Sequence, residues 1–110
     1  MTDVIDFSEW KKLDIRVGQI KAAEDHPSAD KLIILRVDVG EERQLVAGLR
    51  GYYRSEELVG KKVVVFVNLK PIKLRGVQSQ GMVLAAVDTA QDNVSLLSVD
   101  HDVPNGARIE

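Results

Sequence analysis

The chain has 110 residues, a hydrophobic fraction of 45% and a formal net charge of -2, which suit one compact domain over residues 1–110 and exclude two. It contains no cysteine, so disulfides and thiolate metal sites are excluded, and its apolar runs are far shorter than the roughly 18 residues of a membrane-spanning helix. The acidic N-terminus, MTDVIDFSEW, lacks the basic start of a signal peptide. We therefore expect a soluble, cytoplasmic protein without a membrane partner.

The N-terminal residues predict a short helix and then a long, bent strand. Asp6 and Glu9 have the spacing of a capping box, so we expect a helix to start at Asp6. Apolar residues then alternate with polar ones up to Gly18 and continue beyond it on the opposite parity. A change of parity at a glycine predicts a β-bulge. The apolar positions are Leu13, Ile15 and Val17 before the glycine, and Ile20 and Ala22 after it.

The rest of the chain predicts further strands, a second helix and an extension. Residues 31–39 give the clearest strand, because apolar residues at alternate positions share one face. A polar turn at 40–43 joins it to a strand over 44–49. Ser55 is expected to cap a short helix that ends at Gly60. The remaining expected elements are strands over 62–67, 82–87 and 94–99, and a turn with an extended piece over 103–109.

Five core strands, a bent first strand and a small helix between the third and fourth strands are typical of the OB-fold. This fold is a five-stranded Greek-key barrel that often binds oligonucleotides. We therefore predict an all-β protein, an OB-fold barrel with short helices and a C-terminal extension. A generic small β-barrel or sandwich is the structural alternative, and neither fold establishes a function by itself.

Charge is distributed unevenly along the chain. Residues 58–87 contain five basic residues and no acid, whereas the rest of the chain contains ten basic and seventeen acidic residues. Lys70, Lys73 and Arg75 fall in the stretch NLKPIKLRGVQSQGM (68–82), which we expect to be a loop between two strands. Such cations neutralise phosphates and release counterions, so this loop predicts nucleic-acid binding. An ordinary solvated charged face is the alternative.

Several motifs follow one another in a specific order: DIRVG (14–18), HPSADKL (26–32), LVGK (58–61), and NLKP, KLRG and SQGM within 68–82. On these residues, the chain from about Phe7 to its end resembles the tRNA-binding domain family. That family includes the C-terminal domain of methionyl-tRNA synthetases, stand-alone tRNA-binding proteins and a bacterial export-chaperone-like protein. The resemblance implies an OB-fold that binds tRNA by its overall shape, commonly as a homodimer, and that assists methionyl-tRNA synthetase in cis or in trans.

The candidate RNA contacts combine cations with side chains that form hydrogen bonds. Charge and resemblance agree on the three cations of 68–82 as phosphate contacts. The amide and hydroxyl groups nearby can reach a base edge or a 2′-OH, although Asn68 suits a loop-structuring role equally well. Met82 suits either a base contact or the core. Arg36 either extends the basic track or pairs with a nearby acid. The RNA-binding residues that we predict are Asn68, Lys70, Lys73, Arg75, Ser79, Gln80, Met82 and Arg36.

Other functions find less support in the sequence. There is no P-loop or dinucleotide fingerprint, and the two histidines, His26 and His101, are far apart, so we expect no catalytic residue, metal or cofactor. The scarcity of aromatic residues favours recognition of folded RNA by shape and backbone. A peptide-binding chaperone, which needs an exposed apolar groove, and an assembly module of a synthetase complex stay open. Residues 94–109 are the expected dimer interface.

Overall fold

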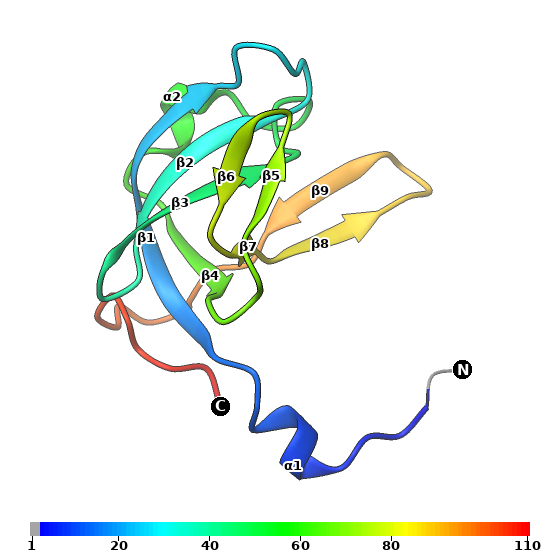
Figure 1. Cartoon of the computed structure of the whole chain (residues 1–110), viewed down its shortest axis with the longest axis vertical. Coiled ribbons are helices and arrows are strands. Elements are labelled where there is room, and N and C mark those ends of the chain that lie inside the picture. The colour runs from blue at the N-terminus through cyan, green and yellow to red at the C-terminus, as the bar shows by residue number, and fades with distance from the viewer. Residues whose placement is uncertain (1–2) are drawn as a thin grey trace.

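A computed structural model describes residues 3–110 of the chain. Five antiparallel strands curl into a nearly closed barrel (Figure 1), with neighbouring strands in the order β3-β2-β1-β4-β7. These strands are β1 (Ile15–Asp25), β2 (Ile33–Asp38), β3 (Glu42–Ala47), β4 (Lys62–Phe66) and β7 (Met82–Val83). The prediction of an all-β, OB-type barrel of five strands is confirmed.

Two short helices and two hairpins complete the described chain. The helices are α1 (Phe7–Trp10) and α2 (Ser55–Leu58), and the hairpins pair β5 (Ile72–Leu74) with β6 (Val77–Ser79) and β8 (Ala85–Asp88) with β9 (Asn93–Leu96). Figure 1 shows α1 set apart from the barrel on the N-terminal part of the chain. Within residues 3–110, no helix has the length and apolar character needed to cross a membrane.

The barrel interior is filled by residues at alternate positions of the strands. On β2, the side chains of Ile33, Leu35 and Val37 are fully buried, as the alternation of the sequence predicts. On β4, Val63 and Val65 are also fully buried and join the same hydrophobic cluster. Burial of each such side chain contributes about 1.5–3 kcal/mol to folding, so this cluster is a main source of the stability of the barrel.

The bend of β1 lies beyond the glycine at which the sequence predicts it. The register of β1 against β2 shifts between Ile20 and Ala22, and no shift occurs at Gly18 in its pairing with β4. Gly18 serves a different purpose, because a Cβ atom there would lie 2.7 Å from Cγ1 of Val37. The glycine therefore allows close packing inside the barrel, and the predicted bulge position was wrong.

The C-terminal residues pair with the part of β1 that β2 leaves free. The N–H of Gly106 donates to the carbonyl of Val17 at 2.7 Å, and the N–H of Ile109 donates to the carbonyl of Ile15 at 2.8 Å. Ile15 and Val17 are buried but lie outside the main core cluster. The apolar residues before Gly18 are therefore buried where the C-terminal segment pairs with β1, whereas Ile20, after it, belongs to the main core. This difference explains why the apolar residues of β1 change from odd to even positions along the strand.

The side chain of Asn105 fastens the same C-terminal segment to the barrel. Its Oδ1 accepts a hydrogen bond from Nζ of Lys62 at 2.8 Å, and its Nδ2 donates to Oδ2 of Asp38 at 3.1 Å. The ammonium group of Lys62 also donates to the carbonyl of Val103 at 2.7 Å. Lys62 belongs to the acid-free stretch of the sequence, but its charge is committed to the C-terminal segment.

Three local expectations differ from the structure. Asp6 is the N-cap of α1 but makes no side-chain cap bond. The N-cap of α2 is Arg54, whose N–H donates to Oε1 of Glu57 at 2.9 Å, so Ser55 is the first helical residue and not the cap. The strand expected over 82–87 divides into β7, which pairs with β4, and β8, which turns away to pair with β9.

Candidate nucleic-acid interface

The basic stretch 68–82 folds into a hairpin and is not the open loop that the sequence predicts. β5 and β6 are joined by Arg75 and Gly76, whose φ angles are 52° and 86°. Two consecutive positive φ values define a type I′ turn, whose twist matches that of paired strands. Gly76 adopts this conformation freely, whereas Arg75 does so at a steric cost. The hairpin gives the cations of this stretch fixed positions.

The three cations of the hairpin region differ in how free they are. Lys70 and Lys73 are exposed, and within residues 3–110 neither belongs to any ion pair. Arg75 is also exposed, but its Nη2 donates to the carbonyl of Ser28 at 3.1 Å. An unpaired, solvated ammonium group is available to a phosphate without breaking an existing contact, so the two lysines are the freest cations here.

A row of polar side chains connects this hairpin to the barrel. Arg36 of β2 lies opposite Gln44 of β3 in the sheet, and Nε2 of Gln44 donates to the carbonyl of Gln78 at 2.8 Å. Gln78 of β6 lies opposite Lys73 of β5. We call Arg36, Gln44, Gln78 and Lys73 the interface row. It places Arg36 and Lys73, which are distant in the sequence, at the two ends of one path across four strands.

Arg36 pairs with an acid, but weakly. Its Nη1 lies 3.5 Å from Oε1 of Glu42, and more than half of each side chain is exposed. Exposed pairs of this kind contribute about 0–1 kcal/mol, so a phosphate can replace the carboxylate at little cost. The sequence left open whether Arg36 extends the basic track or pairs with an acid, and the geometry is compatible with both.

The position of the interface row agrees with how OB-folds bind ligands. In this fold the second and third strands, together with the loops that follow the first and fourth strands, contact oligonucleotides. Here β2 and β3 supply half of the row, and residues 68–81 follow β4. The other loop, residues 26–32, contacts the hairpin tip through the Arg75–Ser28 bond. Gln44, Gln78 and this loop were missed at the sequence level, although the polar parity of β3 points to Gln44.

Asn68 holds the chain in shape at the start of the stretch. Its Oδ1 accepts from the N–H of Asp14 at 2.8 Å, and its Nδ2 donates to the carbonyl of Lys12 at 2.7 Å. The amide thus joins the end of β4 to the residues that precede β1. Of the two roles that the sequence allowed for Asn68, the structure supplies direct contacts for the structural one.

Ser79 and Gln80 close the barrel against β3. The hydroxyl of Ser79, whose residue is only 3% exposed, accepts from the N–H of Val46 at 3.0 Å and donates to the carbonyl of Gly81 at 3.0 Å. Gln80 exchanges two bonds with the backbone of Gln44, at 2.8 Å through its N–H and at 3.1 Å through its Oε1. The prediction that Ser79 contacts RNA is therefore corrected, because its hydroxyl is buried and satisfied.

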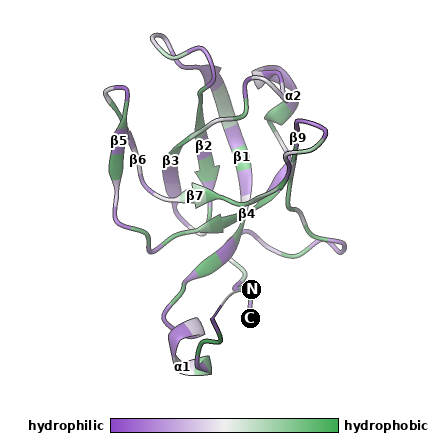
Figure 2. Ribbon diagram, turned by 90° about the vertical axis from the view of Figure 1, so that its right-hand side faces the viewer, coloured by the Kyte–Doolittle hydropathy of each residue, from purple (hydrophilic) through white to green (hydrophobic). Residues whose placement is uncertain are grey.

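Met82 is exposed and lies in an apolar groove between the two hairpins. The residue is 45% exposed, so the core position that its strand suggested was wrong. The groove has a volume of about 340 Å³ and includes the exposed side chains of Leu69, Ile72 and Val87. Figure 2 shows hydrophobic colour on β5, whose residues Ile72 and Leu74 line this groove. Lys70 also lines the groove, so its rim adjoins the cations of the hairpin.

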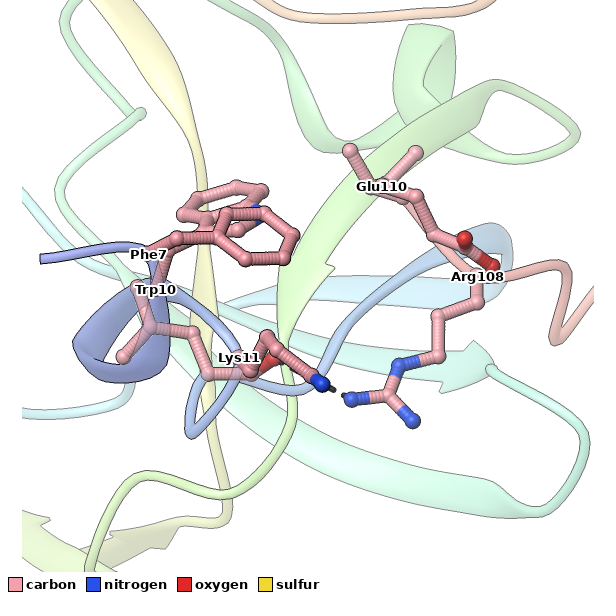
Figure 3. Close-up of a pocket in the computed structure, with 7 residues that line it drawn as sticks. Phe7, Trp10, Lys11, Arg108 and Glu110 are labelled. Atoms are coloured by element: carbon pink, nitrogen blue, oxygen red, sulfur yellow. Dashed lines mark hydrogen bonds between the residues drawn. The ribbon is translucent and has the colours of Figure 1, made fainter.

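A second apolar surface lies on the N-terminal arm (residues 3–10). Val4 is 98% exposed and Phe7 is 72% exposed. Phe7 and Trp10 line a pocket of about 280 Å³ together with Arg108 (Figure 3), which donates from Nη2 to the carbonyl of Leu13 at 3.3 Å. The backbone of 106–109 is bonded to β1, and the arm exposes more large apolar side chains than segment 94–109, the interface expected from the sequence.

The titratable side chains of the described residues are dispersed. Among residues 3–110, no three His, Asp or Glu side chains gather in a way that could hold a metal ion. His101 and Asp100 lie 3.7 Å apart but are more than nine-tenths exposed. Asp14, whose pKa is lowered chiefly by a hydrogen bond from Arg16, belongs to an ion pair beside the C-terminal segment.

Known proteins resemble this chain over nearly its whole length. Residues 15–108 match the family described as "Putative tRNA binding domain". The methionine–tRNA ligase of Methanocaldococcus jannaschii is 55% identical over 106 residues, which are 96% of this chain and 16% of that protein. The MetRS-related protein from Pyrococcus horikoshii has a TM-score of 0.92 at 43% identity, with 99% of this chain and 100% of that chain covered. The chaperone CsaA from Bacillus anthracis has a TM-score of 0.88 at 32% identity, with 98% and 100% covered.

The match includes the β5–β6 hairpin and both ends of the interface row. The chain spans only about a sixth of the length of the curated ligases that it matches, whereas it spans the whole of the two solved structures. The resemblance found in the sequence motifs is thus confirmed. The chain belongs to the tRNA-binding domain family and is related to the methionyl-tRNA synthetases.

Proposed function

We propose that the chain is a non-catalytic, cytoplasmic tRNA-binding module that assists methionyl-tRNA synthetase, in cis or in trans. The observation that carries this proposal is the interface row, which continues from β2 and β3 to the exposed cations of the β5–β6 hairpin. Family membership supports tRNA as the ligand. By raising the local concentration of tRNA near a catalytic region, such a module increases apparent affinity without any chemistry of its own.

Recognition in this proposal is directed at backbone and shape. Residues 68–82 contain three cations, no acid and no aromatic side chain on which a base could stack. Lysine ammonium groups meet phosphates as point charges and carry no information on base sequence. We therefore expect different tRNAs to bind with similar affinity, and binding to weaken steeply as salt rises.

Two exposed lysines of the acid-free stretch provide a matched test. Lys73→Ala should weaken binding of bulk tRNA and reduce the slope of log affinity against log salt by about one, because it removes one phosphate contact. Lys61→Ala removes the same charge beside α2, away from the interface row, and should leave the slope unchanged. Mobility-shift titrations over a salt series measure both.

The outcome of these titrations decides the proposal. Wild-type protein that fails to bind tRNA at about 50 mM salt would falsify it, because phosphate contacts are strongest there. Equal losses from Lys73→Ala and Lys61→Ala would show that net charge matters and that the interface row does not. A loss confined to one tRNA species would indicate readout of bases in place of shape.

We further propose that the protein forms a homodimer through the N-terminal arm. Val4, Ile5 and Phe7 are 98%, 64% and 72% exposed, a concentration of apolar surface that self-association would bury. Phe7→Ser should shift the protein to monomer in sedimentation experiments. Val59→Ser, which changes an apolar residue that is 52% exposed beyond α2, is the control expected to leave the dimer intact. Wild-type protein that sediments as a monomer at micromolar concentration contradicts the proposal.

The apolar groove between the hairpins supports a second candidate function, binding of an extended apolar peptide by a chaperone. The observation in its favour is the set of exposed side chains of Leu69, Ile72, Met82 and Val87, together with the similarity to a chaperone structure. Suppression of client aggregation at a salt concentration that abolishes tRNA binding, and its loss in Ile72→Ser, would support this function. Absence of suppression by the wild-type protein rules it out.

A further inference from the structure

The loop at 26–28 contains a buried histidine that the proposed function has not used. His26 is 3% exposed. The N–H of Ser28 donates to its Nδ1 at 3.1 Å, so Nδ1 is an acceptor and the ring proton resides on Nε2. Nε2 lies 3.1 Å from the carbonyl oxygen of Leu74 and donates to it. Both ring nitrogens are thereby committed, one within the loop and one across to β5.

A second bond joins the same two segments in the opposite direction. Nη2 of Arg75 donates to the carbonyl of Ser28 at 3.1 Å. The loop therefore donates to the hairpin through His26, and the hairpin donates to the loop through Arg75. We call these two bonds the hairpin link. They connect residues separated by 47 and 48 positions in the sequence.

The hairpin link lies where the hairpin most needs support. β5 and β6 share three residue pairs, and a two-stranded hairpin is marginally stable in water. Arg75 adds a left-handed conformation at the turn, which a non-glycine residue keeps only when its surroundings hold it. The bonds to Gln44 and Val46 support the β6 strand from the barrel, but they lie away from the tip.

We propose that His26 is a positioning residue of the tRNA interface, which fixes the tip of the β5–β6 hairpin to the 26–28 loop. The inference rests on the proposed function, since it concerns how the hairpin presents Lys73 and Arg75 to phosphates. A hairpin ordered before tRNA arrives does not have to be ordered on binding, and this raises affinity without an added contact. In this proposal the HPSAD motif (26–30) affects RNA binding indirectly, by holding the β5–β6 hairpin in place.

Two substitutions separate the two bonds of the histidine. His26→Asn places an amide oxygen near the position of Nδ1, so Ser28 keeps its local acceptor, but the side chain is too short to reach Leu74. His26→Gln extends an amide NH₂ toward Leu74 and keeps the bond to the hairpin. Both variants replace a buried ring by an amide, but His26→Asn also lacks the methylene group that His26→Gln keeps, so a local measurement in the hairpin must accompany the affinities.

We expect His26→Asn to weaken tRNA binding by about three- to tenfold, the equivalent of one lost hydrogen bond, and His26→Gln to stay within about twofold of wild type. Hydrogen exchange supplies a readout that a general loss of stability does not give. Amides of residues 72–79 should exchange faster in His26→Asn, while those of β1, β2 and β4 keep their rates. Equal tRNA affinity of the two variants, or unchanged exchange in the hairpin, overturns the proposal.

Lys73→Ala distinguishes failure of this inference from failure of the proposed function. If Lys73→Ala loses affinity and His26→Asn does not, the interface stands and the positioning role is wrong. If the wild-type protein does not bind tRNA, hydrogen exchange in the hairpin still decides whether His26 holds it.

Wild-type protein provides the test if His26→Asn does not fold. The amide protons of residues 72–77 should then be protected from exchange by more than about tenfold relative to an unstructured peptide, since a two-stranded hairpin without further support is only marginally stable. Protection of less than about tenfold overturns the proposal.

Discussion

At the scale of single residues, burial separates side chains that hold the hairpin from those that are free to meet RNA. Ser79→Ala leaves the N–H of Val46 and the carbonyl of Gly81 without their hydroxyl partner. We expect it to lower the free energy of unfolding by about 1–3 kcal/mol, because buried polar groups lose their bonds. Urea denaturation measures this change. Lys73→Ala, at an exposed position, should alter stability by less than about 0.5 kcal/mol, and a Ser79→Ala protein as stable as wild type would contradict the assignment.

The sequence identifies the cations better than the polar neutral residues, for a physical reason. Lys70 and Lys73 have no acid nearby in the sequence and are exposed, so they lack both local and tertiary ion-pair partners among the described residues, unlike Lys62, which the fold brings to the C-terminal segment. A serine or asparagine is small enough to be enclosed, and its partners are set by the tertiary fold. The hydroxyl of Ser79 bonds a residue 33 positions away, and the amide of Asn68 bonds residues 54 and 56 positions away. The pattern of residues near Ser79 or Asn68 in the sequence therefore cannot predict these long-range hydrogen bonds.

At the scale of elements, the turn of the β5–β6 hairpin permits a test of backbone strain alone. Gly76 has a φ of 86°, and a Cβ atom added there would meet nothing within 4 Å. Gly76→Ala should therefore destabilise the hairpin by about 1–2 kcal/mol through conformation only. We expect weaker tRNA binding and faster hydrogen exchange at 72–79, with little change in the melting temperature of the barrel.

Gly51→Ala is the matched control for that experiment. A Cβ atom added at Gly51 would also meet open space, but the φ of this residue does not lie in the left-handed region. The substitution should leave both tRNA affinity and exchange in the hairpin unchanged. If Gly76→Ala behaves in the same way, the turn is not what orders the binding surface.

The elements that the sequence predicts well are those whose burial follows a local period. β2 is an example, since Ile33, Leu35 and Val37 alternate with polar residues and face the core. The division of 82–87 into β7 and β8 was not predictable, because both halves are apolar and differ only in their partners, β4 and β9. The sequence predicts a loop in place of the β5–β6 hairpin because the turn, Arg75–Gly76, lacks the usual asparagine or aspartate before the glycine.

At the scale of the whole molecule, two carboxylates help to fasten the C-terminal segment, which makes stability sensitive to acid. A hydrogen bond from Arg16 lowers the pKa of Asp14 below its ordinary 3.8, and hydrogen bonds from the Gly40 N–H and then Asn105 lower the pKa of Asp38. A lowered folded pKa adds stability above the ordinary value, and this stability is lost as pH falls through the folded pKa. Stability should therefore be level between about pH 7 and pH 5 and decline below about pH 4.

Urea denaturation at a series of pH values measures this decline. Asp14→Asn and Asp38→Asn should each be less stable than wild type at neutral pH and should lose less on acidification, because the titrating group is gone. A wild-type protein whose stability is unchanged well below pH 4 would show that these carboxylates contribute no net stability.

The hydrogen bonds of Asn105 also make the protein sensitive to deamidation during storage. Asn105 is followed by Gly106, and an asparagine before glycine is the sequence most prone to spontaneous deamidation. Conversion of its amide to a carboxylate would replace the donor that lies 3.1 Å from Asp38 with a second anion. Stored protein would then accumulate a more acidic species in which the C-terminal segment is repelled from β2. The storage stability of the protein therefore depends on Asn105, a residue outside the RNA-binding hairpin.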